Sequence, residues 1–408
     1  MAAINVRIFA NDLELQLGTI RLFVNGLAAT AGGGMTYIRN IASQLAARED
    51  VHTTFLVPRR LAEEIPHTAQ VSILTPAQHG GILERSLYEQ WRLPELLDKN
   101  HANVLLSAGN FALYKSPIPQ ILLSRNALYT CKDYYRDLHR RGELRLWLDT
   151  KTKGLLAKRS VNTAEVTVAP SRAFAEELCA WTGQSVTPIH HGFDLKSFQA
   201  HNDELESSIE KQLATDANII RLLFVSHYNY YRNFETLIRG FGKAVSRSKV
   251  PLQLLLTCKL VPGANPGPYN PRSAARLVEQ LGLRPRVLEL GNIPYFQLHQ
   301  LHRRCHIYVT AAYCESFAHP LVEAMSSGLP VIASDIPVHR EICESAAIYF
   351  PHFSDEMLCE RIIQLAASVE KRQCLSSLGS ARSREFSWSR HVEKIISIAK
   401  SLVSAKYD

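Results

Sequence analysis

The sequence lacks the patterns that mark several common classes of protein. Its eight cysteines are scattered, without a C-x-x-C pair or the cysteine and histidine spacing that zinc sites need, so we expect reduced, mostly packed thiols. No apolar run approaches the roughly 20 residues that a membrane-spanning helix requires. The stretch "NVRIFANDLELQLG" interrupts its apolar residues with Asn11, Asp12 and Glu14, so we expect no secretory signal and a cytoplasmic location.

Composition and charge exclude less. Of the 408 residues, 46% are hydrophobic and 21% are charged, which is ordinary for a globular chain, and this length predicts two domains of about 200 residues each. The net charge of +8 favours an anionic partner without naming it. The aromatic residues do not interleave with Lys and Arg as they do in nucleic-acid-binding grooves, so we expect no nucleic acid partner.

Short apolar runs alternate with helical patterns along both halves of the chain. Runs such as "NVLLSAG", "PQILLS", "IRLLFVSH" and "IYVTAA" are apolar on both faces, as in buried strands of parallel sheets. They predict an α/β fold with two doubly wound domains, at residues 1–200 and 215–385. The polar segment 195–218 has no strand pattern, and the apolar spacing in 386–408 predicts an amphipathic terminal helix that packs back toward the N-terminal domain.

The stretch "YCESFAHPLVEAMSSGLPVIASD" places two glutamates, Glu315 and Glu323, around a short helix. Pro320 suits the first helical turn and Gly328 suits the position after the last one, so we expect a helix of about eight residues, Pro320–Ser327. An apolar strand pattern precedes this helix. Its start therefore lies at the carboxyl end of a parallel strand, where open α/β sheets bind ligands.

Backbone N–H groups at such a helix start favour an anion, as does the helix dipole. The amides expected around the anion belong to Ser316, Phe317, Ala318, His319 and Leu321. A bare carboxylate beside a phosphate would be repelled, so we expect Glu315 and Glu323 to accept hydrogen bonds from hydroxyl groups further out. A nucleotide sugar has phosphates in the middle and polyols on both sides. The pattern alone equally allows a solvated Glu315 and a Glu323 that only complements the helix dipole.

This stretch resembles the E-x7-E motif of the family-4 retaining glycosyltransferases. The segments "AGGGMTYIRNIASQLA", "VTVAPSRAFAEEL", "IHHGFDLKSF", "FVSHYNYYRNFETLIRGF" and "GNIPYFQLHQLHRRCHIYV" resemble further parts of that family in the same order, from about Thr19 to the C-terminus. The resemblance implies the GT-B architecture, in which two Rossmann-like domains with parallel sheets face a cleft. It also implies retaining transfer of a hexosyl unit from a nucleotide-diphosphate sugar to a glycan or glycolipid acceptor, as in polysaccharide or lipopolysaccharide biosynthesis.

The resemblance assigns roles residue by residue. Glu315 would contact hydroxyls of the donor sugar, and Glu323 would bind the nucleotide ribose. Arg232 occupies the place of the family's diphosphate-binding lysine, and His227 that of its arginine. The histidine is a departure, because it is charged only part of the time near neutral pH, and a purely structural role for it stays open. Ile293, in "GNIPYF", would line the base pocket.

The N-terminal half contributes a second group of candidates. Gly33 and Gly34 follow "TIRLFVNGLAAT" at a strand-to-helix passage, where the family brings a loop near the diphosphate and acceptor; a flexible turn is the alternative. The run is not G-x-G-x-x-G, and the next strand does not end in an acidic residue, so we do not expect a dinucleotide dehydrogenase. Arg125 and Asn126 occupy a strand end that in relatives offers a polar residue to the sugar or acceptor, although the family's frequent histidine is absent.

The chain contains no D-x-D, so we expect no metal and no cofactor other than the donor as co-substrate. Charge on the leaving diphosphate would be stabilised by Arg232, by His227 when protonated, and by the amides before Pro320. With Glu315 occupied by sugar hydroxyls, no enzyme nucleophile can be named, so we expect front-face attack with a diphosphate oxygen accepting the acceptor's proton. Alternatives within the fold are a nucleotide-sugar epimerase or phosphorylase, and a catalytically degenerate binding subunit.

The basic segment 136–159 has Leu144, Trp147, Leu148 and Leu155 at roughly helical spacing. One interpretation is peripheral contact with an anionic membrane on the cytoplasmic face, which would suit a lipid-linked acceptor. The other is an ordinary helix whose apolar stripe meets the N-terminal sheet while its charges face water. The sequence does not identify the base, the sugar or the acceptor, and its first 18 residues match no part of the family.

Overall fold

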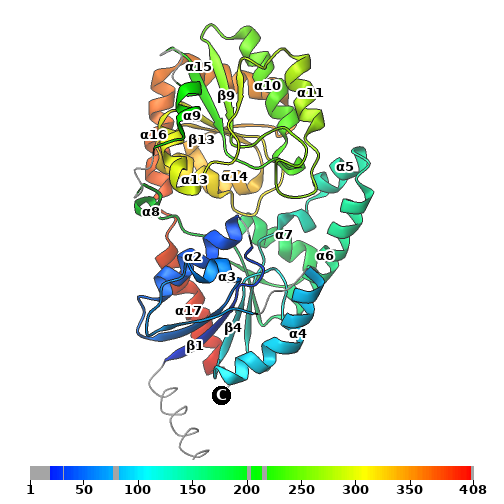
Figure 1. Ribbon diagram of the computed structural model, residues 1–408, viewed down its shortest axis with the longest axis vertical. Helices are drawn as coiled ribbons and strands as arrows, with labels where there is room; N and C mark the ends of the chain where they lie inside the picture. The colour runs from blue at the N-terminus through cyan, green and yellow to red at the C-terminus, as the bar shows by residue number, and fades with distance from the viewer. Residues whose placement is uncertain (1–18, 31, 77–81, 200–203, 214–217, 406–408) are drawn as a thin grey trace, which may run out of the picture. The chain divides into compact units, whose positions relative to one another are not determined.

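The computed structural model describes residues 19–30, 32–76, 82–199, 204–213 and 218–405, so the unmatched first 18 residues lie outside the described part. The chain forms two compact units, each built on a parallel sheet surrounded by helices (Figure 1). Unit 1 comprises Met1–Tyr129, Lys151–Gly192 and Trp388–Asp408, and unit 2 comprises Thr130–Thr150 and Phe193–Ser387.

The sheet of unit 1 has seven strands in the order β3-β2-β1-β4-β5-β6-β7. Their bounds are β1 (Ile20–Asn25), β2 (Val51–Leu56), β3 (Val71–Leu74), β4 (Val104–Ser107), β5 (Gln120–Leu123), β6 (Val166–Ala169) and β7 (Val186–Pro188). All neighbours pair in parallel, with Ile20 opposite Val51 and Leu22 opposite Val104. Because both faces of the central strands are covered, β4 and β5 are buried along their whole length, and most of their residues are apolar.

Helices cover both faces of this sheet. They are α2 (Gly33–Leu45), α3 (Arg59–Ala62), α4 (Ile82–Lys99), η1 (Ala127–Tyr129), α7 (Arg172–Thr182) and α17 (Trp388–Ser404), with most of α6 (Leu144–Thr163). On one face, Ile38 of α2 and Ile395 of α17 join a core cluster with Val24. On the other, Leu93 of α4 packs in a cluster with Phe23. The apolar stripe of the terminal helix α17 thus belongs to the core of unit 1.

The sheet of unit 2 has six parallel strands in the order β10-β9-β8-β11-β12-β13. Their bounds are β8 (Ile220–Phe224), β9 (Leu252–Leu256), β10 (Val287–Glu289), β11 (Ile307–Thr310), β12 (Val331–Ser334) and β13 (Ala347–Phe350). The helices are α5 (Lys132–Arg140), α8 (Leu195–Gln199), α9 (Ser207–Leu213), η2 (Tyr230–Arg232), α10 (Phe234–Arg247), α11 (Arg272–Gln280), η3 (Tyr295–Gln297), α12 (Leu298–Arg303), α13 (His319–Ser326), α14 (Pro337–Cys343), η4 (Glu344–Ala346), α15 (Asp355–Ala367) and α16 (Val369–Ser383).

The unit boundaries differ from the predicted 1–200 and 215–385 in two places. Thr130–Thr150 groups with unit 2, because Tyr134 of α5 is buried and its hydroxyl hydrogen-bonds that of Tyr269 at 3.2 Å. The polar segment after Phe193 also belongs to unit 2, since the fully buried Phe198 of α8 packs against unit 2 side chains. The order of the elements along the chain could not show that these two segments belong to unit 2.

Both sheets have the same pattern of strand order, and this pattern indicates where each sheet would bind a ligand. In each, the strand order reverses direction between the first strand of the unit and the fourth, at β1 and β4 in unit 1 and at β8 and β11 in unit 2. Doubly wound sheets bind ligands at the carboxyl ends of the strands beside this reversal. The predicted α/β class with two Rossmann-like sheets is confirmed, and the loops after β1, β4, β8 and β11 become the places to search.

Candidate functional site

The loop from β11 into α13 carries Glu315 at the carboxyl edge of the unit 2 sheet. The helix runs from His319 to Ser326, one residue earlier than predicted at each end. At its end Gly328 has φ 73° and donates its N–H to Met325 O at 3.1 Å, as expected of a glycine that closes a helix. Its N-cap, Ala318, has φ 66°, a left-handed conformation that the sequence did not predict and that is uncommon for a residue with a Cβ atom.

The neighbouring loop, after β8, carries Arg232 in η2. Arg232 Nη1 donates to Glu315 Oε1, and the two side chains are 17% and 10% exposed. The backbone joins the same loops, because the N–H of Tyr313 donates to the carbonyl of Tyr231 at 3.0 Å. The structure therefore brings together two of the predicted site residues, at the switch point of the sheet.

Burial shapes the electrostatics of this pair. Burial raises the pKa of the Glu315 carboxyl above its ordinary value, and the charge of Arg232 opposes that rise. Burial would lower the pKa of the Arg232 guanidinium, but the Glu315 carboxylate raises it on balance, so the arginine stays charged. Its Nε–H is buried and has no hydrogen-bond partner in the part of the chain that the structure describes. A buried charged donor without an acceptor is costly unless a ligand completes it.

Glu323 lies in the second turn of α13. It is 6% exposed, and burial raises the pKa of its carboxyl to about 7. Among the described residues, no side chain donates a hydrogen bond to this carboxylate or forms an ion pair with it. The helix dipole acts mainly within the first turn, so it does not account for a carboxylate that is buried one turn further on.

His227 lies in the loop between β8 and η2. Burial of the ring, followed by the nearby Arg232 charge, lowers its pKa below the ordinary value, so the imidazole is neutral at pH 7. Its carbonyl accepts a hydrogen bond from the Ser226 hydroxyl and one from Asn229 Nδ2 at 3.3 Å. The structure therefore places His227 within electrostatic reach of Arg232, with a ring that can donate one neutral hydrogen bond.

Fewer backbone N–H groups are free to bind an anion at the start of α13 than the sequence predicted. The Leu321 N–H donates to Ala318 O at 3.0 Å, so it is used inside the first helical turn, and the inclusion of Leu321 as an anion donor is wrong. The side chains of Phe317 and Leu321 are buried, as is that of Ile293 in the loop after β10. These residues can therefore offer a ligand little beyond backbone. Ser316 and His319 are half-buried at the helix start.

A short helix that the sequence analysis missed supports both loops. Asp137 of α5 accepts hydrogen bonds from the Tyr313 hydroxyl at 2.9 Å and from Arg141 Nε at 3.0 Å. Arg141 Nη1 also donates to Glu235 Oε1 at 2.9 Å, at the start of α10. Tyr313 lies two residues before Glu315, and Glu235 lies three residues after Arg232. No local pattern could reveal this, because Asp137 and Tyr313 are 176 positions apart.

In unit 1 the predicted Gly33 and Gly34 begin α2, and the Arg125 side chain lies against Gly34. A Cβ atom added at Gly34 would lie 2.7 Å from Arg125 Nη2, so a larger residue there would displace the guanidinium from its present position. The Arg125 N–H donates to Asn110 Oδ1 at 2.7 Å, and the side-chain oxygen of Asn126 accepts from the Leu128 N–H at 3.1 Å. Asn126 thus caps its own turn.

Arg125 differs from most arginines of the chain in its surroundings. Burial lowers the pKa of its guanidinium, and no carboxylate in the described part of the chain offsets this. The guanidinium lies beside the first turn of α2, where backbone N–H groups and the helix dipole also favour negative charge. The arrangement can hold an anion.

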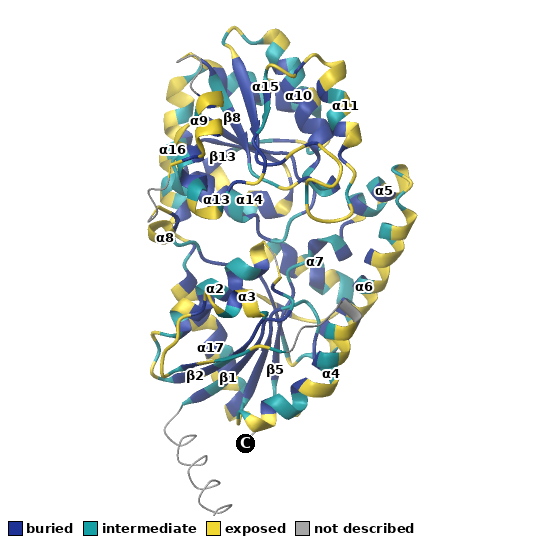
Figure 2. Ribbon diagram, in the orientation of Figure 1, coloured by how far each residue is buried: buried dark blue, intermediate teal, exposed yellow. Residues whose placement is uncertain are grey.

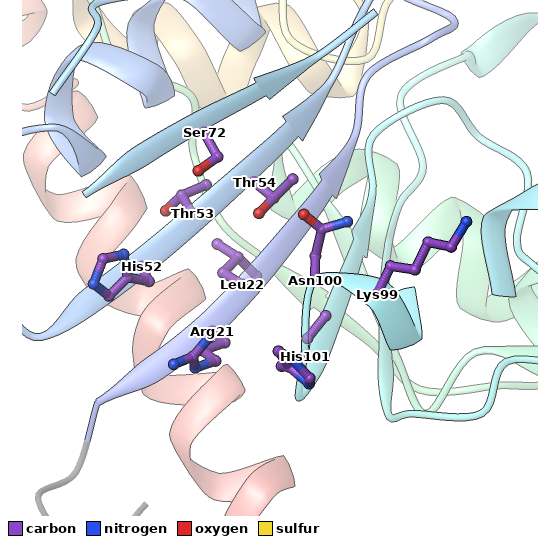
Figure 3. Close-up of a pocket in the computed structure, with 10 residues that line it drawn as sticks. Arg21, Leu22, His52, Thr53, Thr54, Ser72, Lys99, Asn100 and His101 are labelled. Carbon is purple, nitrogen blue, oxygen red and sulfur yellow. The ribbon is translucent and has the colours of Figure 1, made fainter. Parts of the chain in front are cut away.

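A cavity of about 220 Å³ in unit 1 is lined by none of these residues, and Figure 3 shows the side chains that line it. It is lined by Arg21, Leu22, His52, Thr53, Thr54, Ser72, Lys99, Asn100, His101 and Ala102. These belong to the amino-terminal halves of β1, β2 and β3 and to the end of α4, opposite the carboxyl edge where doubly wound sheets bind ligands. Within the described ranges, no helix has both the length and the apolarity to cross a bilayer.

Two family models match the chain. The model described as Glycosyltransferase Family 4 matches residues 31–197, and that described as Glycosyl transferases group 1 matches residues 206–380.

Curated relatives match over parts of their length. A D-inositol 3-phosphate glycosyltransferase of Corynebacterium aurimucosum is 20% identical over 262 residues, which are 63% of this chain and 61% of the relative. The O-antigen chain mannosyltransferase B of Escherichia coli is 26% identical over 113 residues, 28% of this chain and 30% of the relative. The chain thus covers less than two thirds of either relative.

Solved structures match over nearly the whole chain. A sucrose-phosphate synthase from Thermosynechococcus elongatus superposes with a TM-score of 0.74 at 20% identity, over 95% of this chain and 100% of that one. Anabaena HepE in complex with UDP and glucose superposes with a TM-score of 0.67 at 18% identity, over 94% of this chain and 100% of that one. At these identities the likeness concerns the fold.

Proposed function

Because the chain belongs to the glycosyltransferases of group 1 and family 4, we propose that it moves a hexosyl unit from a nucleotide-diphosphate sugar to a hydroxyl group of a glycan or glycolipid. The observation that carries the proposal is the buried guanidinium of Arg232, whose Nε–H lacks a partner among the described residues at the switch point of unit 2. Diphosphate oxygens are acceptors that a guanidinium binds in a forked manner. The relatives named above act on sugars, and HepE was solved with UDP, which supports a nucleotide-linked donor.

Donor binding would use the atoms of Arg232 and Glu315 that do not take part in their ion pair. Glu315 holds Nη1 through Oε1, so Nε remains for a phosphate oxygen, and Oε2 remains for a sugar hydroxyl. Glu323, buried and without a partner in the described chain, would accept hydrogen bonds from the ribose. His227 would add one neutral hydrogen bond to the diphosphate.

Transfer would retain the anomeric configuration. Glu315 is held by Arg232 and serves the sugar hydroxyls, so no carboxylate is left as a nucleophile. The acceptor oxygen would bond to the anomeric carbon on the face from which the diphosphate oxygen leaves. That leaving oxygen would take the acceptor's proton, while Arg232 stabilises the remaining diphosphate charge without a metal ion.

On the acceptor side, Arg125 favours a substrate that carries negative charge. Its guanidinium is half-buried beside Gly34 at the start of α2 and has no carboxylate partner in the described chain. A phosphate on the acceptor, of the kind in the names of the inositol-phosphate and sucrose-phosphate relatives, fits this arrangement. Asn126, fixed by its own turn, would contribute less.

Thermal shift with UDP-, GDP- and ADP-hexoses tests donor binding, because a ligand of the folded state raises its apparent stability. We expect the nucleotide sugar with one of these bases to raise Tm. We also expect mass spectrometry to show transfer of the hexosyl unit to a glycan or lipid extract, and this transfer should continue in EDTA. Glu315→Gln should lower turnover by about 100-fold. Conversion of the nucleotide sugar without an acceptor would instead indicate an epimerase. Failure of every nucleotide to bind would indicate a degenerate subunit.

A further inference from the structure

Helices α4 and α6 carry many exposed residues, drawn in yellow in Figure 2, and several of these residues are large and apolar. Leu87 and Trp91, one turn apart on α4, are 60% and 78% exposed, and Leu155 and Leu156 of α6 are 70% and 43% exposed. Single exposed leucines are ordinary on protein surfaces, but a group of this kind marks a contact surface.

The two sets of side chains flank one residue, Tyr114. On α4, Gln90 shares the face of Leu87 and Trp91, since the three are spaced i, i+3 and i+4. The Gln90 side chain accepts a hydrogen bond from the Tyr114 N–H at 3.0 Å, and the Tyr114 hydroxyl donates to Leu156 O at 3.4 Å. We call Leu87, Trp91, Tyr114, Leu155 and Leu156 the α4–α6 surface.

Positive charge borders this surface. The guanidinium of Arg159 lies over the Tyr114 ring, 4.4 Å from its centroid, and Lys115 is exposed beside it. Helix α6 carries Arg145, Lys151, Lys153, Lys158 and Arg159 against one acid, Asp149, a net charge of +4. On α4, Arg92 and Lys99 are both paired with Glu95, at 2.6 Å and 2.7 Å. The excess of positive charge therefore belongs to α6 and Lys115.

The hypothesis that the apolar stripe of α6 meets the sheet of unit 1 is wrong for three of its four residues. Leu155 is exposed, and the same continuous helix also exposes Leu144 by 63% and Leu148 by 62%. Only Trp147 is half-buried. The cause is that α6 turns its small residues inward instead, with Gly154, Ala157 and Ser160 all buried.

We propose that the α4–α6 surface binds the surface of an anionic lipid bilayer. Leucine and tryptophan side chains enter the boundary between headgroups and acyl chains, and neighbouring Lys and Arg contact lipid phosphates. A bilayer accepts apolar and basic side chains interspersed in this way, whereas a protein partner would need matching acids at fixed positions. Such docking would bring a lipid-linked acceptor to the enzyme, but it does not depend on the proposed function.

Sedimentation of the full chain with vesicles tests the proposal without any sugar nucleotide, so its failure would leave the donor experiment untouched. At about 50 mM salt, we expect binding to phosphatidylcholine vesicles that contain about 30% phosphatidylglycerol, and about tenfold weaker binding without the anionic lipid or at about 500 mM salt. Trp91 is the most exposed of the four tryptophans, so binding should shift its emission to shorter wavelength, and Trp91→Phe should remove the shift.

Paired variants distinguish binding through this surface from nonspecific adsorption to vesicles. Trp91→Ser with Leu155→Ser should weaken vesicle binding about tenfold, and so should Lys115→Ser with Arg159→Ser. The matched control, Leu281→Ser with Leu378→Ser, changes leucines of unit 2 that are 45% and 41% exposed and should bind like the parent chain. Absent binding, or equal binding by all variants, would overturn the proposal. So would lipid-independent self-association that Trp91→Ser abolishes, because a second copy would then cover the surface.

Discussion

Arg232 and Glu315 form a buried ion pair whose stability effect depends on both partners together. Removing one partner of such a pair leaves an uncompensated buried charge, which destabilises a protein by roughly 3–5 kcal/mol. Arg232→Met should therefore lower the free energy of unfolding by about that amount, since Glu315 is only 10% exposed. The double variant Arg232→Met with Glu315→Gln should recover most of the loss. Urea unfolding of the parent chain, Arg232→Met, Glu315→Gln and the double variant measures this, and additive losses would contradict a coupled pair.

Glu323 makes the stability of unit 2 depend on pH. Burial raises the pKa of its carboxyl to about 7 from an ordinary 4.5, so the folded chain holds a proton that the unfolded chain has lost between these two values. The free energy of unfolding falls through that window, by about 3 kcal/mol in total, and is flat above it. Glu323→Gln removes this fall. Its stability relative to the parent should therefore be greater at pH 8 than at pH 5, and an equal difference at both pH values would contradict the account.

The residues of the site differ in how far the sequence could reveal them. Pro320 and Gly328 mark the helix ends through local backbone preferences, so α13 was predicted to within one residue. The left-handed Ala318 and the hydrogen bond that uses the Leu321 amide arise from packing of the assembled loop, and no local preference indicates them. The unpaired Nε–H of Arg232 likewise becomes visible only when its neighbours are known.

At the scale of elements, α5 fixes both loops of the proposed donor site. Tyr313→Phe and Asp137→Ala each remove the 2.9 Å hydrogen bond that holds the Glu315 loop. Each should weaken nucleotide binding about threefold to tenfold, and the double variant should lose no more than the stronger single one, because groups in contact share one interaction. Asp98→Ala, which changes an exposed acid on α4, is the control.

Isothermal calorimetry with the nucleotide that the thermal shift selects gives these affinities. A structural role alone would lower Tm without changing affinity. Additive losses in the double variant would show that Asp137 and Tyr313 do not act as a unit.

The sequence predicted elements well where apolar periodicity was strong. Clear apolar patterns in the sequence mark the strands β8, β11 and β12 and the terminal helix α17, so these elements could be recognised. Helix α5 was not placed, because its own sequence is polar and its partners lie in the other half of the chain. The prediction that the leucine face of α6 is buried was also wrong, since small residues rather than leucines pack inward.

For the whole molecule, alternating strand and helix patterns were enough to predict two doubly wound sheets. They were not enough to show that each unit is discontinuous, with Thr130–Thr150 in unit 2 and Trp388–Asp408 in unit 1. Such crossings depend on long-range burial, which periodicity does not report. The switch points of the two sheets nevertheless follow from the strand order, and they contain most of the residues that the family resemblance selected.

The most direct test of the account is calorimetric titration of the selected nucleoside diphosphate into Glu315→Gln and into the double variant Arg232→Met with Glu315→Gln. The double variant lacks the guanidinium but leaves no unpaired buried carboxylate, so the fold should survive and the proposed phosphate contact should not. A hydrogen bond between charged groups contributes about 1.5–3 kcal/mol, so Kd should rise by roughly ten- to a hundredfold from Glu315→Gln to the double variant. Binding by the double variant as tight as that of Glu315→Gln would contradict the claim that this guanidinium holds the diphosphate.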